Sequence, residues 1–178
     1  MHQYRLFIHG LLVMGLVIGL GLTAIAHDDD DPPSSEQIAF AQRTSDLLLS
    51  TVVAALFHEF DEISAENVAE GSQTIELIFH NHNWDIRLVG TMGPLGGHNN
   101  FPRDRFEQDA LALALSGQAY TNVEPVKDTW YYRRSFPLNN NLHAACVLCH
   151  TNFLPMQQDQ WVGALMLRVP INSNDRDD

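Results

Sequence analysis

The sequence has 178 residues, with 22 acidic against 10 basic side chains and a formal net charge of −12 at pH 7. This acidity argues against nucleic acid and anionic membrane surfaces as partners, because both are polyanions. The length fits one domain with its own hydrophobic core.

The first 26 residues are predicted to be a secretory signal peptide. They contain Arg5 and no acidic residue, an apolar run from Leu11 to Ile25, and the small-x-small pattern of Ala24, Ile25 and Ala26. The apolar run is shorter than the roughly 20 residues of a spanning helix, and no later stretch reaches that length. We therefore expect cleavage after Ala26 and an exported, periplasmic protein with no membrane span in the mature chain.

A long amphipathic helix is expected after a polar lead-in, residues 27–35, that is predicted to be disordered. Ser34 or Ser35 offers the N-cap, with acidic and amide side chains close behind. Apolar residues then recur mostly at steps of three or four, as a helix requires: Ile38, Ala41, Leu48, Val52, Leu56, Phe60 and Ile63. The next segment is expected to be a short helix or loop that ends at Gly71.

Residues 74–91 predict a β-hairpin, with strands at 74–80 and 84–91, because β-branched and aromatic residues flank a polar "HNHN" turn. A loop rich in glycine and asparagine leads to a helix that begins at Pro102 and stops at Gly117. Strands are predicted at 129–138 and 161–171, with a loop and a short helix between them and a polar tail over 171–178. This order predicts an α+β domain at 36–170, an antiparallel sheet with helices packed on it.

The only cysteines of the chain, Cys146 and Cys149, are followed at once by His150. C-x-x-C-H is the pattern for covalent attachment of a c-type haem. In a helical turn the two thiols would match the two vinyl groups of the porphyrin, and the His150 imidazole would be the proximal iron ligand. Export strengthens this prediction, because haem is attached after export. We therefore expect one covalent haem c.

Three other chemistries remain open for the motif. A structural zinc site needs four ligands, which the two cysteines with His80 and His82 could supply. A thioredoxin-like dithiol would need a βαβ context, which the pattern does not predict. A disulfide across two residues would close a small loop, and such bonds gain little entropy and are usually strained or catalytic.

Several motifs, in their order along the chain, resemble the Tll0287-like haem domain family, also called DUF3365. They are Ile86-Arg87, Asn99-Asn100-Phe101-Pro102, the helix from Asp104 to Leu111, the strand from Trp130 to Arg134, and Cys146 to His150. The resemblance covers residues 36–168. It implies a PAS-like fold with a long N-terminal helix and one c-type haem, and it suggests redox or gas sensing or electron transfer rather than a defined enzyme reaction.

The second axial ligand of the iron is left open by the sequence. Some members of the family use a cysteine near the first helix, and this chain has no third cysteine. Ligation by Met and His raises the reduction potential of the haem, whereas an open sixth position on the iron permits gas binding. The candidates are His98, then His58, then Met92, followed by His143, Met156 and Met166. Arg133 and Arg134 are predicted propionate contacts, because guanidinium forks suit carboxylates.

The leading hypothesis is an exported monohaem protein that senses redox state or a small gas. It would act with a redox partner protein or a separate signalling protein. A small periplasmic electron-transfer cytochrome is the alternative, and it would need two strong axial ligands. A haem enzyme would need an open iron with distal acid–base groups, for which no constellation in the sequence argues. A haem-free binding protein with a disulfide is the remaining hypothesis.

Overall fold

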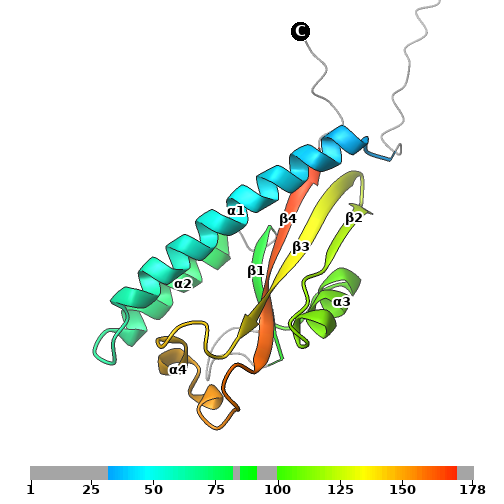
Figure 1. The fold of residues 1–178 in the computed structure, drawn as a ribbon. Coiled ribbons are helices and arrows are strands. Elements are labelled where there is room, and N and C mark those ends of the chain that lie inside the picture. Colours follow the sequence, from blue (N-terminus) through cyan, green and yellow to red (C-terminus); the bar gives the residue numbers. More distant parts are fainter. Residues whose placement is uncertain (1–31, 82–84, 92–99, 172–178) are drawn as a thin grey trace, which may run out of the picture.

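The computed structural model describes residues 32–81, 85–91 and 100–171 (Figure 1). They form an α+β fold, consistent with a PAS-like one, in which a four-stranded antiparallel sheet carries helices on both faces. The elements are α1 (Ser35–Glu62), α2 (Val68–Asn81), β1 (Ile86–Gly90), α3 (Arg105–Ala114), β2 (Thr121–Val126), β3 (Thr129–Asn139), α4 (Cys146–Cys149), the 3-10 helix η1 (Thr151–Phe153) and β4 (Trp161–Ile171). The predicted signal peptide and residues 172–178 of the predicted tail lie outside the described residues.

The long helix α1 begins where the sequence predicts. Ser34 is the N-cap: its hydroxyl accepts the Gln37 N–H at 3.3 Å, and the Gln37 side chain accepts the Ser34 N–H at 2.8 Å. This reciprocal pair satisfies two backbone donors that a helix start otherwise leaves without partners. The helix lies along the sheet, where Ala41 and Leu56 are buried, and covers one of its faces (Figure 1).

The prediction of a first hairpin strand at 74–80 is wrong, because residues 68–81 form the helix α2. Gly71 does not end a segment but lies inside α2, where its backbone approaches the Ile63 side chain too closely for a Cβ atom. Ile75 and Phe79 are also spaced as on one helical face, and Phe79 packs against the buried sheet cluster of Ile86, Leu165 and Leu167. Burial of this face outweighed the β propensity of the segment.

The sheet has the strand order β1-β4-β3-β2. The second strand of the predicted hairpin exists as β1, but its partner is β4, the strand farthest from it in the sequence. The predicted strands at 129–138 and 161–171 are confirmed as β3 and β4. The sequence did not predict β2, an edge strand that contains Glu124 and Pro125; proline is tolerated at an edge, where no second ladder needs its missing N–H.

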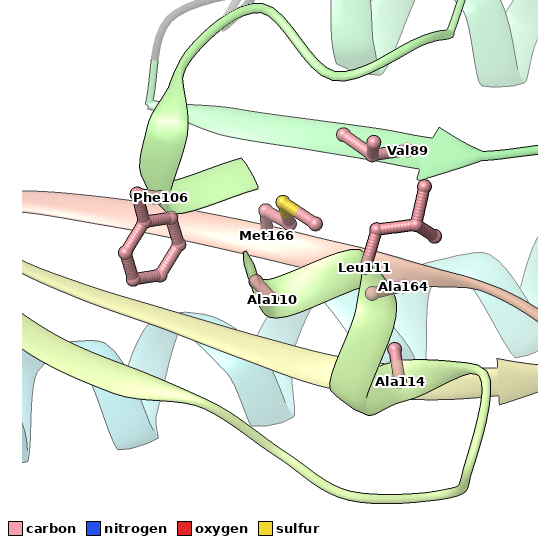
Figure 2. Close-up of a cluster of buried hydrophobic side chains, with 7 residues drawn as sticks. All are labelled: Val89, Phe106, Ala110, Leu111, Ala114, Ala164 and Met166. Atoms are coloured by element: carbon pink, nitrogen blue, oxygen red, sulfur yellow. The ribbon is translucent and has the colours of Figure 1, made fainter. Parts of the chain in front are cut away.

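Side chains of β4 alternate between the two faces of the sheet. Leu165 and Leu167 face α1 and α2, whereas Ala164 and Met166 face α3. Figure 2 shows the cluster on the α3 side, which consists of Val89, Phe106, Ala110, Leu111, Ala114, Ala164 and Met166.

The helix α3 starts later than predicted. Its N-cap is Asp104, whose carboxylate accepts the Glu107 N–H at 2.9 Å, rather than Pro102. Gly117 ends the following turn as expected, with a positive φ of 77° that favours glycine. Within the described ranges, no helix combines the length and the apolar character needed to cross a bilayer.

Candidate functional site

The C-x-x-C-H segment forms one helical turn, α4, as the motif predicts. The His143 carbonyl accepts the Cys146 N–H at 3.0 Å, and the Cys146 carbonyl accepts the His150 N–H at 2.8 Å. His150 itself is not helical, with φ −109° and ψ 65°, so the chain leaves the helix at this residue. The i, i+3 spacing places the two cysteines on the same side of the turn. The turn lies below the sheet, past the end of β3 (Figure 1).

Both thiols are free and half-buried. Burial raises the pKa of Cys146, and backbone hydrogen bonds at His143 and Cys146 oppose this rise only in part. Burial also raises the pKa of Cys149, against which the Ser72 hydroxyl of α2 acts by hydrogen bonding to the sulfur. Both side chains are therefore neutral thiols at pH 7.

The His150 ring is held in a parallel stack on Phe153, with ring centroids 4.6 Å apart and an interplanar angle of 7°. Burial lowers the pKa of His150, so the imidazole is neutral at pH 7, the form in which histidine binds metals. Its Nδ1 atom is buried and has no hydrogen-bond partner among the described residues. A buried polar atom without a partner lowers folding stability by about 1–3 kcal/mol, which a bound ligand or water that satisfied this atom would recover.

His143 connects the turn from Cys146 to His150 to α1. Its Nε2 lies 3.0 Å from Asp61 Oδ1, and its Nδ1 accepts the Ala145 N–H at 3.1 Å. The ring stacks on Phe60, with centroids 5.5 Å apart, and meets Phe57 edge-on. Both ring nitrogens of His143 thus have hydrogen-bond partners, and His143 would have to lose one of these contacts to bind iron.

The other candidate axial ligands that the structure describes lie in three different settings. His58 is exposed on α1. Met166 is buried against α3, on the sheet face opposite to α1. Met156 is half-buried shortly after η1, with its N–H donated to the Phe153 carbonyl at 3.0 Å. The two candidates of residues 92–99, His98 and Met92, lie outside the described residues.

The zinc alternative stays untested. The His80 side chain and all of His82 lie outside what the structure describes. In the part of the chain that is described, no three His, Cys, Asp or Glu side chains are grouped so that they could hold a metal ion.

Arg133 and Arg134 point to opposite faces of the sheet, and each has carboxylate partners within the chain. Arg133 is buried on the α3 side, where it binds Asp104 at 2.8 Å and Glu124 at 2.7 Å, and it lies over the Phe106 ring. Arg134 is ion-paired with Asp46 of α1. Contacts to propionates remain a prediction for both residues, and they would compete with these pairs.

Sequence reasoning missed two residues that contact the motif from elsewhere in the chain. Ser72 reaches Cys149 from α2, and Asp61 reaches His143 from the end of α1. No local pattern marks either residue. Ser72 also lies just before a segment that was predicted as a strand, so its helical orientation toward Cys149 was hidden.

The arrangement can hold a ligand in two ways at once. Two neutral thiols on one side of a turn can bond to two carbon atoms or form a disulfide, and the adjoining neutral imidazole can bind a metal. No protein-family model matches the sequence, and no curated protein matches it either. The family resemblance therefore rests on the sequence motifs described above.

Proposed function

We propose that the chain is an exported monohaem c-type protein that acts as a redox- or gas-sensing module. One observation carries the proposal. A single helical turn presents two free thiols at i, i+3, followed by a neutral imidazole whose buried Nδ1 has no hydrogen-bond partner among the described residues. Covalent attachment of a haem requires two such thiols, and axial ligation of its iron requires a neutral imidazole.

Each residue of the turn has a distinct role in this proposal. Cys146 and Cys149 would hold the haem through thioether bonds, and His150 would bind its iron. A bound haem supplies an iron that changes oxidation state and can bind a small gas. Phe153 restricts rotation of the His150 ring by stacking on it.

Apolar side chains beside the turn support the same proposal. Leu148, which directly precedes Cys149, is 37% exposed, and Leu154, five residues after Cys149, is 67% exposed. Both side chains therefore leave apolar surface in contact with water near the thiols. A porphyrin or a docking protein would remove part of this apolar surface from water.

The distal ligand separates the sensing function from its alternative. His143 and Met166 are occupied by other contacts, so His98, His58, Met92, Met156 and an exogenous ligand are the distal ligands that the proposal keeps. An exogenous or displaceable ligand suits a sensor. A small electron-transfer cytochrome is the second candidate, which the exposure of Leu148 and Leu154 favours, because an electron carrier must let a redox partner approach its cofactor.

The test is to produce residues 27–178 with a c-type maturation system and to record ferric and ferrous spectra with and without carbon monoxide. We expect a haem band that survives acid–acetone extraction, and a ferrous spectrum that shifts with carbon monoxide. The double variant Cys146→Ala/Cys149→Ala should lose the covalent haem, whereas the control Glu62→Ala, an exposed residue of α1, should keep it.

Two outcomes would contradict the proposal at different levels. Absence of covalent haem in the unsubstituted chain would contradict the proposed cofactor. Zinc binding or a disulfide would then explain the motif. Covalent haem that ignores carbon monoxide would mean two strong axial ligands and would favour electron transfer, with His98→Ala and His58→Ala as the next variants.

A further inference from the structure

The turn from Cys146 to His150 is joined to the end of α1 through the side chain of His143. The ring lies between the two segments: its Nδ1 accepts the N–H of Ala145, immediately before Cys146, and its Nε2 contacts Asp61 Oδ1 of α1. The side chain is 19% exposed and packs on Phe60 and Phe57 of the same helix. The link therefore combines two hydrogen bonds with aromatic packing.

These contacts define one tautomer of His143. Because Nδ1 accepts the Ala145 N–H, the proton of the neutral ring is on Nε2, from which it is donated to Asp61. Asp61 thus holds the ring in the tautomer that can accept from the turn. The His143 backbone contributes as well, since its carbonyl accepts the Cys146 N–H at 3.0 Å.

We infer that His143 is a positioning residue, which together with Asp61 sets the orientation of the Cys146–His150 turn relative to α1. This inference deepens the proposed function and, for the haem-bound protein, rests on it. Because the turn carries both cysteines and the proposed proximal ligand, any displacement of His150 has a short path to α1 through Ala145, His143 and Asp61. The helix α1 is then the element that responds to a change at the site.

The first test uses the haem-free protein under reducing conditions, so that it does not depend on haem attachment. Hydrogen–deuterium exchange of the Ala145 and Cys146 amides is compared between the unsubstituted chain and Asp61→Ala. Losing one partly exposed hydrogen bond should speed exchange about three- to tenfold at these amides. Asp61→Asn keeps an acceptor oxygen and should restore exchange to within about twofold of the unsubstituted rate.

Two further variants separate positioning from a general loss of stability. Glu62→Ala removes a neighbouring exposed carboxylate of α1 and should leave exchange in the turn unchanged. His143→Asn keeps an acceptor for the Ala145 N–H but is too short to reach Asp61. Its effect on the Cys146 amide should therefore not add to that of Asp61→Ala in the double variant.

The second test uses the haem-bound protein and reads the ferric electron paramagnetic resonance spectrum. We expect altered or heterogeneous signals in Asp61→Ala and a single unaltered species in Asp61→Asn and Glu62→Ala. Unchanged amide exchange in Asp61→Ala, equal acceleration in Glu62→Ala, or additive effects in the double variant would each overturn the inference. If no haem attaches to the unsubstituted chain, the proposed function fails, while the exchange experiment still decides the role of His143.

Discussion

Arg87 of β1 and Glu107 of α3 form a buried ion pair on the α3 side of the sheet, with side chains only 7% and 6% exposed. The pair is completed by backbone contacts, since Glu107 Oε2 accepts the Arg103 N–H at 2.7 Å and Arg87 Nη2 donates to the Phe101 carbonyl at 3.3 Å. The strand, the segment before α3 and the helix are thereby held together.

This ion pair also brings together motifs that are separate in the sequence. Arg87 belongs to the Ile86-Arg87 motif and Glu107 to the helix motif that begins at Asp104, while Asp104 itself binds Arg133 of β3 at 2.8 Å. Charged residues of three of the motifs, namely Arg87, Asp104 with Glu107, and Arg133, thus meet in one network. Their spacing in the chain reflects a structural unit on the α3 face.

Replacing Glu107 should destabilise the protein strongly. Glu107→Ala leaves the Arg87 guanidinium buried without its carboxylate, and loss of one partner of a buried pair costs about 3–5 kcal/mol. Urea denaturation of the haem-free protein measures this change in the free energy of unfolding. The matched control is Asp109→Ala, whose pair with Arg105 on the same helix is exposed and should cost at most about 0.5 kcal/mol. A loss of similar size in the two variants would contradict the prediction.

Ser72→Ala should make the Cys149 thiol less reactive. The Ser72 hydroxyl lowers the pKa of Cys149 by hydrogen bonding to its sulfur, so its removal raises that pKa further and reduces the thiolate fraction at a given pH. The rate of alkylation by iodoacetamide, followed against pH in a Cys146→Ala background, measures the effect. Ser72→Thr keeps a hydroxyl and is the matched control; a rate in Ser72→Ala equal to or above that of the control would disprove the contact.

Acid should destabilise the haem-free protein through His150. Burial lowers the pKa of this imidazole in the folded chain below its ordinary value of 6.5, so the unfolded chain binds a proton more readily than the folded one. The stabilisation from a neutral His150 is complete above pH 6.5 and is lost as the pH falls toward the lowered pKa.

The urea midpoints of the unsubstituted chain and His150→Gln, compared at about pH 7.5 and about pH 5.5, test this dependence. The unsubstituted protein should lose more stability between the two values than His150→Gln does. The exposed His58 provides the control, since His58→Gln should keep the full acid sensitivity. An acid sensitivity that survives in His150→Gln would assign it to other groups.

The sequence by itself determined the elements whose signals are local. The N-cap signal at Ser34 or Ser35 and the apolar spacing that follows were sufficient for α1, and the runs of aromatic and aliphatic residues were sufficient for β3 and β4. The turn from Cys146 to His150 was also evident, because its chemistry depends on a spacing of a few residues.

Only the tertiary structure decided the features that depend on residues far apart in the chain. Residues 68–81 form a helix whose Phe79 packs against the cluster of Ile86, Leu165 and Leu167, and β1 pairs with β4 rather than with the segment before it. The contact of His143 with Asp61 likewise joins residues 82 positions apart. Local sequence patterns do not predict such pairings, because the free energy that favours them comes from burial and hydrogen bonding between distant segments.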